Sequence, residues 1–280
     1  MEYNGYLIEI NKTGYGTKHD LYGFFLDGEI YSGSGESIED CKKQINEILN
    51  LTIYNEDCQD TLLLRKLNFD YVFTSPPYNL GGDFHTFVKG KRVTHGDYDG
   101  FSDNLPEKEY QEQQISVLNQ LYNGLSEDGV CFYNHKIRIK NRKIIHPLEW
   151  INKTKFNIYQ IVTIDFGSTP NVDKSRFFPV SELMFILTKK QEPLIINKSC
   201  LTDIVKIKKG GRKKGHPATF SENMVETFLS TVKRKGLVYD PYIGTGTTAI
   251  TSNKLGFTCI GSEVSRKTYD LCKNTIKNEL

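Results

Sequence analysis

The stretch Phe69-Asp70-Tyr71-Val72-Phe73-Thr74-Ser75-Pro76-Pro77-Tyr78-Asn79 decides how this chain folds and where its site lies. Its β-branched and aromatic start predicts a buried strand over residues 69–74. The two prolines that follow hold φ at about −65° and lack an N–H donor, so the strand must end in a stiff, extended loop. A loop at the carboxyl end of a strand in an open α/β sheet is a usual place for a ligand.

This loop carries groups that suit a flat ring with an amino substituent. The Ser75 hydroxyl and the carbonyls of Ser75 and Pro76 are hydrogen-bond acceptors, and Tyr78 offers an aromatic face for stacking. The alternative is a surface turn stiffened by its prolines, and the motif alone does not decide between them.

The composition is that of a water-soluble globular protein. The 280 residues are 38% hydrophobic and 25% charged, without an apolar run long enough to span a bilayer or a secretion signal. The six cysteines form no CxxC pair, which favours reduced thiols in the cytoplasm over disulfides or a zinc site. Because the net charge is only +2, a nucleic-acid partner has to be argued from local basic clusters.

Residues 1–49 are predicted to form a small accessory ββα unit. Strands are expected over residues 6–10 and 22–26, and Ser37 is placed to cap a helix with apolar residues three and four apart. We expect this unit to cover an edge of the main sheet; a part in substrate binding is the alternative.

Residues 50–280 alternate strands and helices, which predicts a doubly wound α/β fold with a mostly parallel, seven-stranded sheet. The expected strands lie near residues 51–55, 69–74, 129–134, 158–165, 182–188, 236–241 and 257–262. The expected helices lie near residues 58–67, 107–125, 145–153, 221–234, 246–255 and 265–278. Two segments interrupt the alternation: residues 80–106 are predicted to be a long mobile loop, and residues 189–216 are rich in lysine and arginine.

A second glycine-rich turn follows the predicted strand that ends at Asp240. In Pro241-Tyr242-Ile243-Gly244-Thr245-Gly246-Thr247-Thr248 the glycines let the backbone approach a ligand at the start of a helix. The turn lacks the lysine of a phosphate-binding P-loop and the third glycine of a dinucleotide fingerprint, which argues against NAD. Glu263 follows the next strand, where a carboxylate can accept from ribose hydroxyls, so a nucleoside site is indicated.

The two sites together resemble a DNA methyltransferase of the exocyclic-amino class, in its permuted (beta-type) order with the catalytic loop ahead of the cofactor glycines. The resemblance runs from about Asn50 to Leu280. Besides the loop over residues 74–79 and the turn over residues 240–248, it rests on Tyr54-Asn55-Glu56-Asp57-Cys58, Leu125-Ser126-Glu127-Asp128-Gly129-Val130, Arg176-Phe177-Phe178-Pro179-Val180-Ser181-Glu182 and His216-Pro217-Ala218-Thr219-Phe220-Ser221. The last segment departs from the family because no lysine-proline pair follows Thr219, and Tyr242 replaces the usual phenylalanine.

The resemblance implies S-adenosylmethionine as the cofactor and an exocyclic amine of a flipped base as the methyl acceptor. It places the amine on the Ser75 hydroxyl and the Pro76 carbonyl, with Tyr78 stacked on the base. The implied catalytic residues are Ser75, Pro76, Pro77 and Tyr78. The implied cofactor-binding residues are Asp57, Asp240, Pro241, Tyr242, Gly244, Thr245, Gly246, Thr247, Thr248 and Glu263, with Asp57 at the adenine amine and Glu263 at the ribose.

Double-stranded DNA is the partner that the resemblance implies, and a restriction endonuclease partner is compatible with it. The predicted phosphate-contacting residues are basic and fall in two segments. They are Lys206, Lys208, Lys209, Arg212, Lys213 and Lys214 in the first, and Lys89, Lys91 and Arg92 in the second. A third candidate for phosphate contact is the basic run of Lys136, Arg138, Lys140, Arg142 and Lys143.

The target base stays open between cytosine N4 and adenine N6. The serine that starts the loop favours cytosine narrowly, because such loops often act on cytosine in this class. Two further classes remain as alternatives: a methyltransferase of RNA or of protein glutamine, and a non-catalytic DNA-binding subunit with a relic cofactor fold. The composition, rich in Lys, Asn and Ile, suits an AT-rich bacterial or viral genome.

Overall fold

An eight-stranded sheet forms the centre of the protein in a computed structural model, which describes residues 2–3, 6–10, 22–26, 30–48, 51–80, 84–88, 91–95, 97–98, 101–169, 175–208 and 221–280. Its strands are β5 (Thr52–Tyr54), β6 (Phe69–Thr74), β11 (Leu125–His135), β14 (Asn157–Asp165), β15 (Ser181–Thr188), β16 (Ile204–Lys206), β17 (Leu237–Asp240) and β18 (Thr258–Ser262). They lie in the order β16-β14-β15-β11-β6-β17-β18-β5. Only β15 runs against its two neighbours, so the sheet is mostly parallel.

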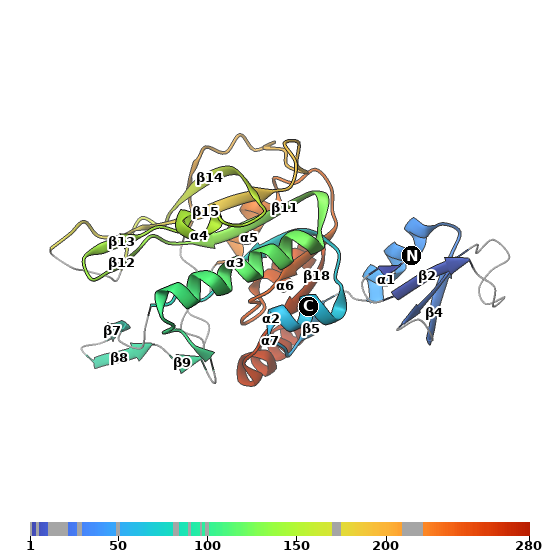
Figure 1. Ribbon diagram of the computed structural model, residues 1–280, viewed down its shortest axis with the longest axis horizontal. Helices are drawn as coiled ribbons and strands as arrows, with labels where there is room; N and C mark the ends of the chain where they lie inside the picture. Colours follow the sequence, from blue (N-terminus) through green and yellow to red (C-terminus); the bar gives the residue numbers. More distant parts are fainter. Residues whose placement is uncertain are drawn as a thin grey trace.

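Helices cover both faces of this sheet (Figure 1). They are α2 (Cys58–Arg65), α3 (Glu107–Gly124), α4 (Leu148–Ile151), α5 (Glu222–Leu229), α6 (Thr247–Lys254) and α7 (Arg266–Glu279). Side chains alternate along β6, so Val72 packs in one core with α2, α3 and α4, while Tyr71 and Phe73 pack in another with α5, α6 and α7. The doubly wound α/β architecture predicted from the alternation is confirmed.

The sheet has one strand more than the seven predicted, and that strand is β16. Ile204-Val205-Lys206 pairs in parallel with β14 at the edge of the sheet. The prediction missed it because three residues carry little periodicity and the lysines around them dominate the pattern. Part of the basic segment over residues 189–216 is therefore built into the sheet.

The N-terminal unit also has more strands than the two predicted. A four-stranded antiparallel sheet consists of β1 (Glu2–Tyr3), β2 (Tyr6–Ile10), β3 (Tyr22–Leu26) and β4 (Ile30–Gly35), and α1 (Ile38–Ile48) follows it. Strand β4 contains Gly33 and Gly35, which predicted a turn. The chain order ββββα replaces the predicted ββα.

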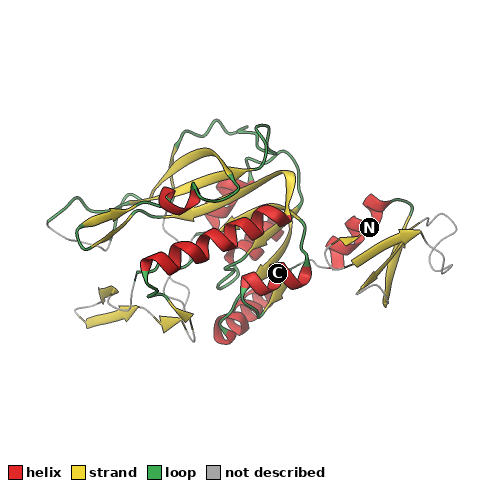
Figure 2. Cartoon of the chain, in the orientation of Figure 1, coloured by secondary structure: helices red, strands yellow, loops and turns green. Residues whose placement is uncertain are grey.

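Two β-hairpins stand where residues 80–106 predicted one long loop (Figure 2). Strands β7 (Phe84–Val88) and β8 (Lys91–His95) form the first, and β9 (Asp97–Tyr98) pairs with β10 (Phe101–Ser102) in the second. The run Phe84-His85-Thr86-Phe87-Val88 has the residue types of a strand. The prediction missed these strands because the glycine, aspartate and histidine residues around them are typical of a loop.

A glycine fixes how closely the loop after β17 packs on β18. A Cβ atom added to Gly261 would lie 2.7 Å from Cβ of the buried Ile243. We expect Gly261→Ala to lower the free energy of unfolding by about 1–3 kcal/mol, because one backbone would have to move away from the other. Urea unfolding followed by circular dichroism measures the change.

Thr258→Ala, at the partly buried start of the same strand, is the matched control and should cost less than about 1 kcal/mol. If both variants lost the same free energy of unfolding, the close packing of Gly261 against Ile243 would be contradicted.

Candidate active site

One buried hydrogen bond joins the proline loop to the glycine-rich turn. Strands β6 and β17 are parallel neighbours, so the loops at their carboxyl ends emerge at the same edge of the sheet. There the hydroxyl of Thr74, the last residue of β6, donates to Oδ1 of Asp240, the last residue of β17, at 3.0 Å. Both side chains are fully buried. The two motifs that the sequence places far apart therefore form one site.

Asp240 organises the glycine-rich turn as well. Its carboxylate accepts from the Tyr242 backbone N–H at 3.0 Å and from the Thr248 hydroxyl at 2.5 Å. Burial raises the pKa of Asp240 to about 6, although its three donors act in the opposite direction. The cost of burying this charge is thus only partly offset by hydrogen bonds.

The turn itself owes its shape to two glycines with positive φ angles. Gly244 and Gly246 adopt positive φ angles of 55° and 88°, and Gly246 starts helix α6. The hydroxyl of Thr245, between them, is buried without a hydrogen-bond partner in the described part of the chain. Glu263, just after β18, accepts from the Gly244 N–H at 3.1 Å and from the Ser265 N–H at 2.9 Å. Burial raises the pKa of Glu263.

The loop after β5 completes this edge of the site. Asp57 caps helix α2 by accepting from the Gln59 N–H at 2.8 Å. Two residues earlier, the Asn55 side-chain amide donates to the Glu263 carbonyl at 2.8 Å. The contact holds the loops after β5 and β18 together, so Asp57 and Glu263 lie on adjoining loops.

In the proline loop, the Tyr78 hydroxyl lies among three oxygen atoms. It is 2.7 Å from Ser75 Oγ, 2.7 Å from Asn134 Oδ1 and 3.1 Å from Glu182 Oε2. Burial, and then the nearby Glu182 charge, raise the pKa of Tyr78 well above its ordinary value, so the phenol keeps its proton. The Tyr78 proton can serve only one of the two acceptors, Asn134 Oδ1 and Glu182 Oε2, at a time, while the Ser75 hydroxyl can donate to the phenol oxygen. The cluster therefore has spare capacity to accept a hydrogen bond.

The end of the loop is held by Asn79, the residue that the motif analysis left without a chemical role. Asn79 is buried with φ 53°, and its N–H donates to Asp103 Oδ1 at 2.6 Å. Its side-chain amide donates to the Leu105 carbonyl at 2.9 Å and accepts from the Leu105 N–H at 2.7 Å. Asn79 therefore braces the loop against the segment that leads into α3.

A buried tyrosine holds one of the two proline carbonyls. The Tyr110 hydroxyl donates to the Pro77 carbonyl at 2.8 Å and lies 2.8 Å from Nε2 of His135. Burial lowers the pKa of His135 to about 3, so this histidine stays neutral. Tyr110 thus occupies the Pro77 carbonyl, while the acceptor that the resemblance assigns to a substrate amine is the carbonyl of the preceding residue, Pro76.

Four residues of this neighbourhood received no site role from the sequence: Tyr110, Asn134, His135 and Glu182. A topological signal exists for two of them. Asn134 lies near the carboxyl end of β11, and Glu182 lies at the start of β15, which runs antiparallel to β11. The end of one strand and the start of its antiparallel neighbour meet at one edge, which brings both side chains to Tyr78.

The predicted DNA-contacting residues are only partly covered by the structure. Lys206 and Lys208 are exposed, next to the edge strand β16. Lys91 and Arg92 lie in strand β8. The remaining predicted positions, Lys89, Lys209, Arg212, Lys213 and Lys214, lie outside the described residues, as does the His216–Ser221 motif up to Phe220.

The family model for DNA methylases of the N6/N4 type matches residues 69–274. The chain belongs to this family. It is 25% identical to the Type II methyltransferase M.HinfI of Haemophilus influenzae over 84% of this chain and 70% of that protein. It is 24% identical to the Type II methyltransferase M2.MboI of Moraxella bovis over 82% of this chain and 91% of that protein.

Solved structures agree on the fold. The PvuII DNA methyltransferase, described as cytosine-N4-specific, superposes with a TM-score of 0.61 at 18% identity and covers 82% of this chain and 94% of its own. The M1.HpyAVI–SAM complex gives a TM-score of 0.58 at 17% identity, over 80% of this chain and 97% of its own. This DNA methylase is therefore an S-adenosylmethionine-dependent enzyme that methylates an exocyclic amino group of DNA.

The glycine-rich edge fits that cofactor. A Cβ atom at Gly244 would meet only the Tyr242 carbonyl, at 3.8 Å, so the backbone there is open to a ligand, and the Thr245 hydroxyl next to it has no partner in the described part of the chain. Gly246 instead lets the turn pack against Cys272 of α7. Glu263 and Asp57 lie in the loops that follow the neighbouring parallel strands β18 and β5, where carboxylates can accept from the ribose hydroxyls and the adenine amine. The residues that would hold the cofactor are those predicted from the sequence between Asp240 and Thr248, with Asp57 and Glu263.

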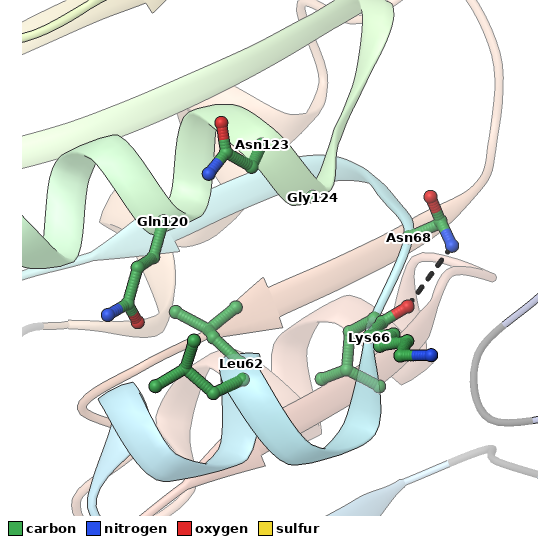
Figure 3. A pocket seen from close by; sticks show the side chains of 8 residues that line it. Leu62, Lys66, Asn68, Gln120, Asn123 and Gly124 are labelled. Carbon is green, nitrogen blue, oxygen red and sulfur yellow. Dashed lines mark hydrogen bonds between the residues drawn. The ribbon is translucent and has the colours of Figure 1, made fainter.

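A separate hollow lies away from this site. A hollow of about 370 Å³ lies between α2 and α3, lined by residues that include Leu62, Lys66, Asn68 and Gln120 (Figure 3). It lies by Asn68, just before the amino end of β6, whereas the proline loop follows the carboxyl end of the same strand. In the described ranges there is no cluster of three metal-ligating side chains, and no helix is long and apolar enough to cross a membrane.

The raised pKa of Asp240 predicts a pH-dependent stability. The unfolded carboxyl loses its proton near its ordinary value of 3.8, whereas the folded one keeps it up to about pH 6. The wild-type protein should therefore lose about 2–3 kcal/mol of stability from this group as the pH rises from about 4 to 7. Asp240→Asn keeps the shape and cannot ionise, so its stability relative to wild type should rise over that range.

Urea unfolding of both proteins at a series of pH values measures this difference, with the unmutated protein as the reference at each pH. Curves that stay parallel from pH 4 to 7 would contradict a raised pKa at Asp240.

Proposed function

We propose that this enzyme is a site-specific methyltransferase that acts on N4 of cytosine in double-stranded DNA. The observation that carries the proposal is the buried Thr74–Asp240 hydrogen bond, which ties the amine-accepting loop to the cofactor turn. With both loops fixed on adjacent strands, an amine and a methyl donor are held side by side, and positioning of this kind supplies a large share of rate enhancement.

Ser75 and Pro76 bind and orient the target amine. An exocyclic amine is a poor nucleophile because its lone pair is delocalised into the ring. The Ser75 Oγ and the Pro76 carbonyl accept from its two N–H groups and favour tetrahedral geometry, which returns the lone pair to the nitrogen. Bound S-adenosylmethionine supplies the electrophilic methyl group. Serine is a weak base, so the amine proton leaves to solvent after transfer.

Tyr78 acts in two ways during this cycle. Without DNA, its hydroxyl takes the place beside Ser75 Oγ that the target amine needs. When the flipped base enters, the hydroxyl gives up that position and the ring stacks on the base. Asn134 Oδ1 and Glu182 Oε2, which faced the hydroxyl, then remain as acceptors at the border of the base pocket.

The preference for cytosine rests on the loop and on one structural relative. Cytosine and adenine both present an amine donor beside a ring-nitrogen acceptor, so hydrogen bonds at the amine do not separate them. Serine at the first loop position favours cytosine N4, and the PvuII enzyme with the same fold is described as cytosine-N4-specific. N6 of adenine is the second candidate.

Further parts of the proposal concern the surroundings of the site. The relatives are named Type II methyltransferases, which supports a restriction endonuclease partner and a cytoplasmic location. Residues 50–280 form the catalytic domain and residues 1–49 an accessory unit. The lysines at positions 206 and 208, with their neighbours up to Lys214, contact DNA phosphates.

Incubation with labelled S-adenosylmethionine and mixed-sequence duplex DNA, followed by digestion to nucleosides and mass spectrometry, tests the target directly. N4-methylcytosine is the expected product. N6-methyladenine would overturn the cytosine assignment, and label found only in RNA or protein would overturn DNA as the substrate.

Variants of the proline loop separate the roles of its side chains. Ser75→Ala should lower kcat by about 100-fold or more, because one acceptor for the amine is lost. Tyr78→Phe keeps the stacking ring and should retain kcat within about tenfold, whereas Tyr78→Ala should lose most activity. Single-turnover methylation measures these rates.

Binding of S-adenosylmethionine, followed by calorimetry, is the control and should be unchanged in all three variants. If Tyr78→Phe were as inactive as Tyr78→Ala, the hydroxyl and not the ring would be the essential group.

A further inference from the structure

A rigid basic hairpin extends directly from the wall of the active site. Strand β11 ends at His135, and the ammonium group of the next residue, Lys136, lies 5.2 Å from the centre of the Tyr78 ring. The chain then forms the hairpin of β12 (Arg138–Lys140) and β13 (Lys143–Ile145) (Figure 1). The position of this hairpin is thus tied to the catalytic loop.

The turn of the hairpin is short and stiff. Two residues connect its strands, Asn141 and Arg142, and their φ angles are 52° and 60°. Positive φ at both positions is the type I′ geometry, which matches the twist of a two-residue hairpin. The hairpin therefore presents a fixed shape.

Its base is anchored by a buried arginine, and this corrects the sequence interpretation of the third basic run. The Arg138 guanidinium donates to both carboxylate oxygens of Glu107 at 2.9 and 2.7 Å. It also lies 4.8 Å from the centre of the Tyr110 ring and 5.5 Å from that of Trp150. Only 5% of Arg138 is exposed, so it cannot contact DNA. It fixes the hairpin to α3 and α4 instead.

The outer part of the hairpin combines positive charge with exposed apolar surface. Lys140 and Lys143 are paired across the strands, and both are exposed, as is Arg142 at the turn. On the opposite face Ile139 is paired with Ile144, and these side chains are 49% and 65% exposed. From Lys136 to Ile145 there are five basic residues and no acidic one.

We propose that the β12–β13 hairpin enters the major groove of duplex DNA beside the flipped base. A two-stranded ribbon has the width that the major groove admits, and the amino groups of cytosine and adenine both face that groove. Lys140, Arg142 and Lys143 contact phosphates at the groove edges. Ile139 and Ile144 contact the apolar parts of the base edges. This inference rests on the proposed function for its substrate, duplex DNA.

The charge part is tested with the triple variant Lys140→Gln/Arg142→Gln/Lys143→Gln. Fluorescence anisotropy with a labelled, mixed-sequence duplex gives Kd at several salt concentrations. Each lost phosphate contact lowers the slope of log Kd against log salt by about 0.9, so a decrease of about 2 to 3 is expected. Lys267→Gln/Lys273→Gln/Lys277→Gln removes three exposed charges from α7 and is the matched control.

The apolar part is tested with Ile139→Ser/Ile144→Ser. Because burial of apolar surface releases no counterions, this variant should weaken binding by about tenfold at every salt concentration without changing the slope. Arg142→Gln alone, with an expected slope change of about 0.9, serves if the triple variant fails to fold, which thermal unfolding reveals.

The proposal would be overturned if the triple variant and the α7 control had the same slope of log Kd against log salt. Affinity unchanged in the isoleucine variant would overturn the groove contact. Failure of the proposed function would show differently: the wild type would bind duplex DNA with the predicted salt dependence of the hairpin but form no methylated nucleoside.

Discussion

The buried carboxylate of Asp240 is the constraint on which the rest of the site depends. It receives hydrogen bonds from the end of β6, from the backbone of the glycine-rich turn and from the first turn of α6. A carboxylate in this position has to be surrounded by donors, since burial without them costs several kcal/mol. The donors it collects come from both functional loops, so satisfying one charge also fixes the two loops relative to each other.

The proline loop is held by a second set of contacts, made by the Asp103 carboxylate and by uncharged groups. Asn79 and Tyr110 fix its backbone through Leu105, Asp103 and the Pro77 carbonyl. Prolines restrict the loop from within, and these hydrogen bonds restrict it from outside. In the proposed mechanism Ser75 and Tyr78 face the substrate, and their side-chain contacts with each other are ones that a base can replace. Rigid backbone and exchangeable side chains are what a site that binds by base flipping needs.

The sequence predicted the fold and the two motifs because their signals are local. A β-branched run before two prolines, and a strand before Gly-Thr-Gly, read correctly without tertiary information. It could not predict contacts made across strands. The link between Thr74 and Asp240 spans 166 positions, and the Tyr78–Glu182 contact spans 104. Strand β16 was missed for a different reason: with three residues, it owes its existence to the neighbouring β14 rather than to its own pattern.

The basic run after β11 shows that a charge count does not distinguish exposed cations from a buried one. Five cations in ten residues suggest one continuous nucleic-acid surface, yet Arg138 is buried against Glu107 and two aromatic rings. The free-energy cost of desolvating this guanidinium is offset by its two parallel hydrogen bonds to the Glu107 carboxylate. A lysine ammonium could not make this bidentate contact. The buried arginine gives the exposed cations beyond it a fixed position. In the proposed complex a hairpin without that anchor could still bind phosphates, but it would not hold the duplex at a fixed distance from Tyr78 and the proline loop.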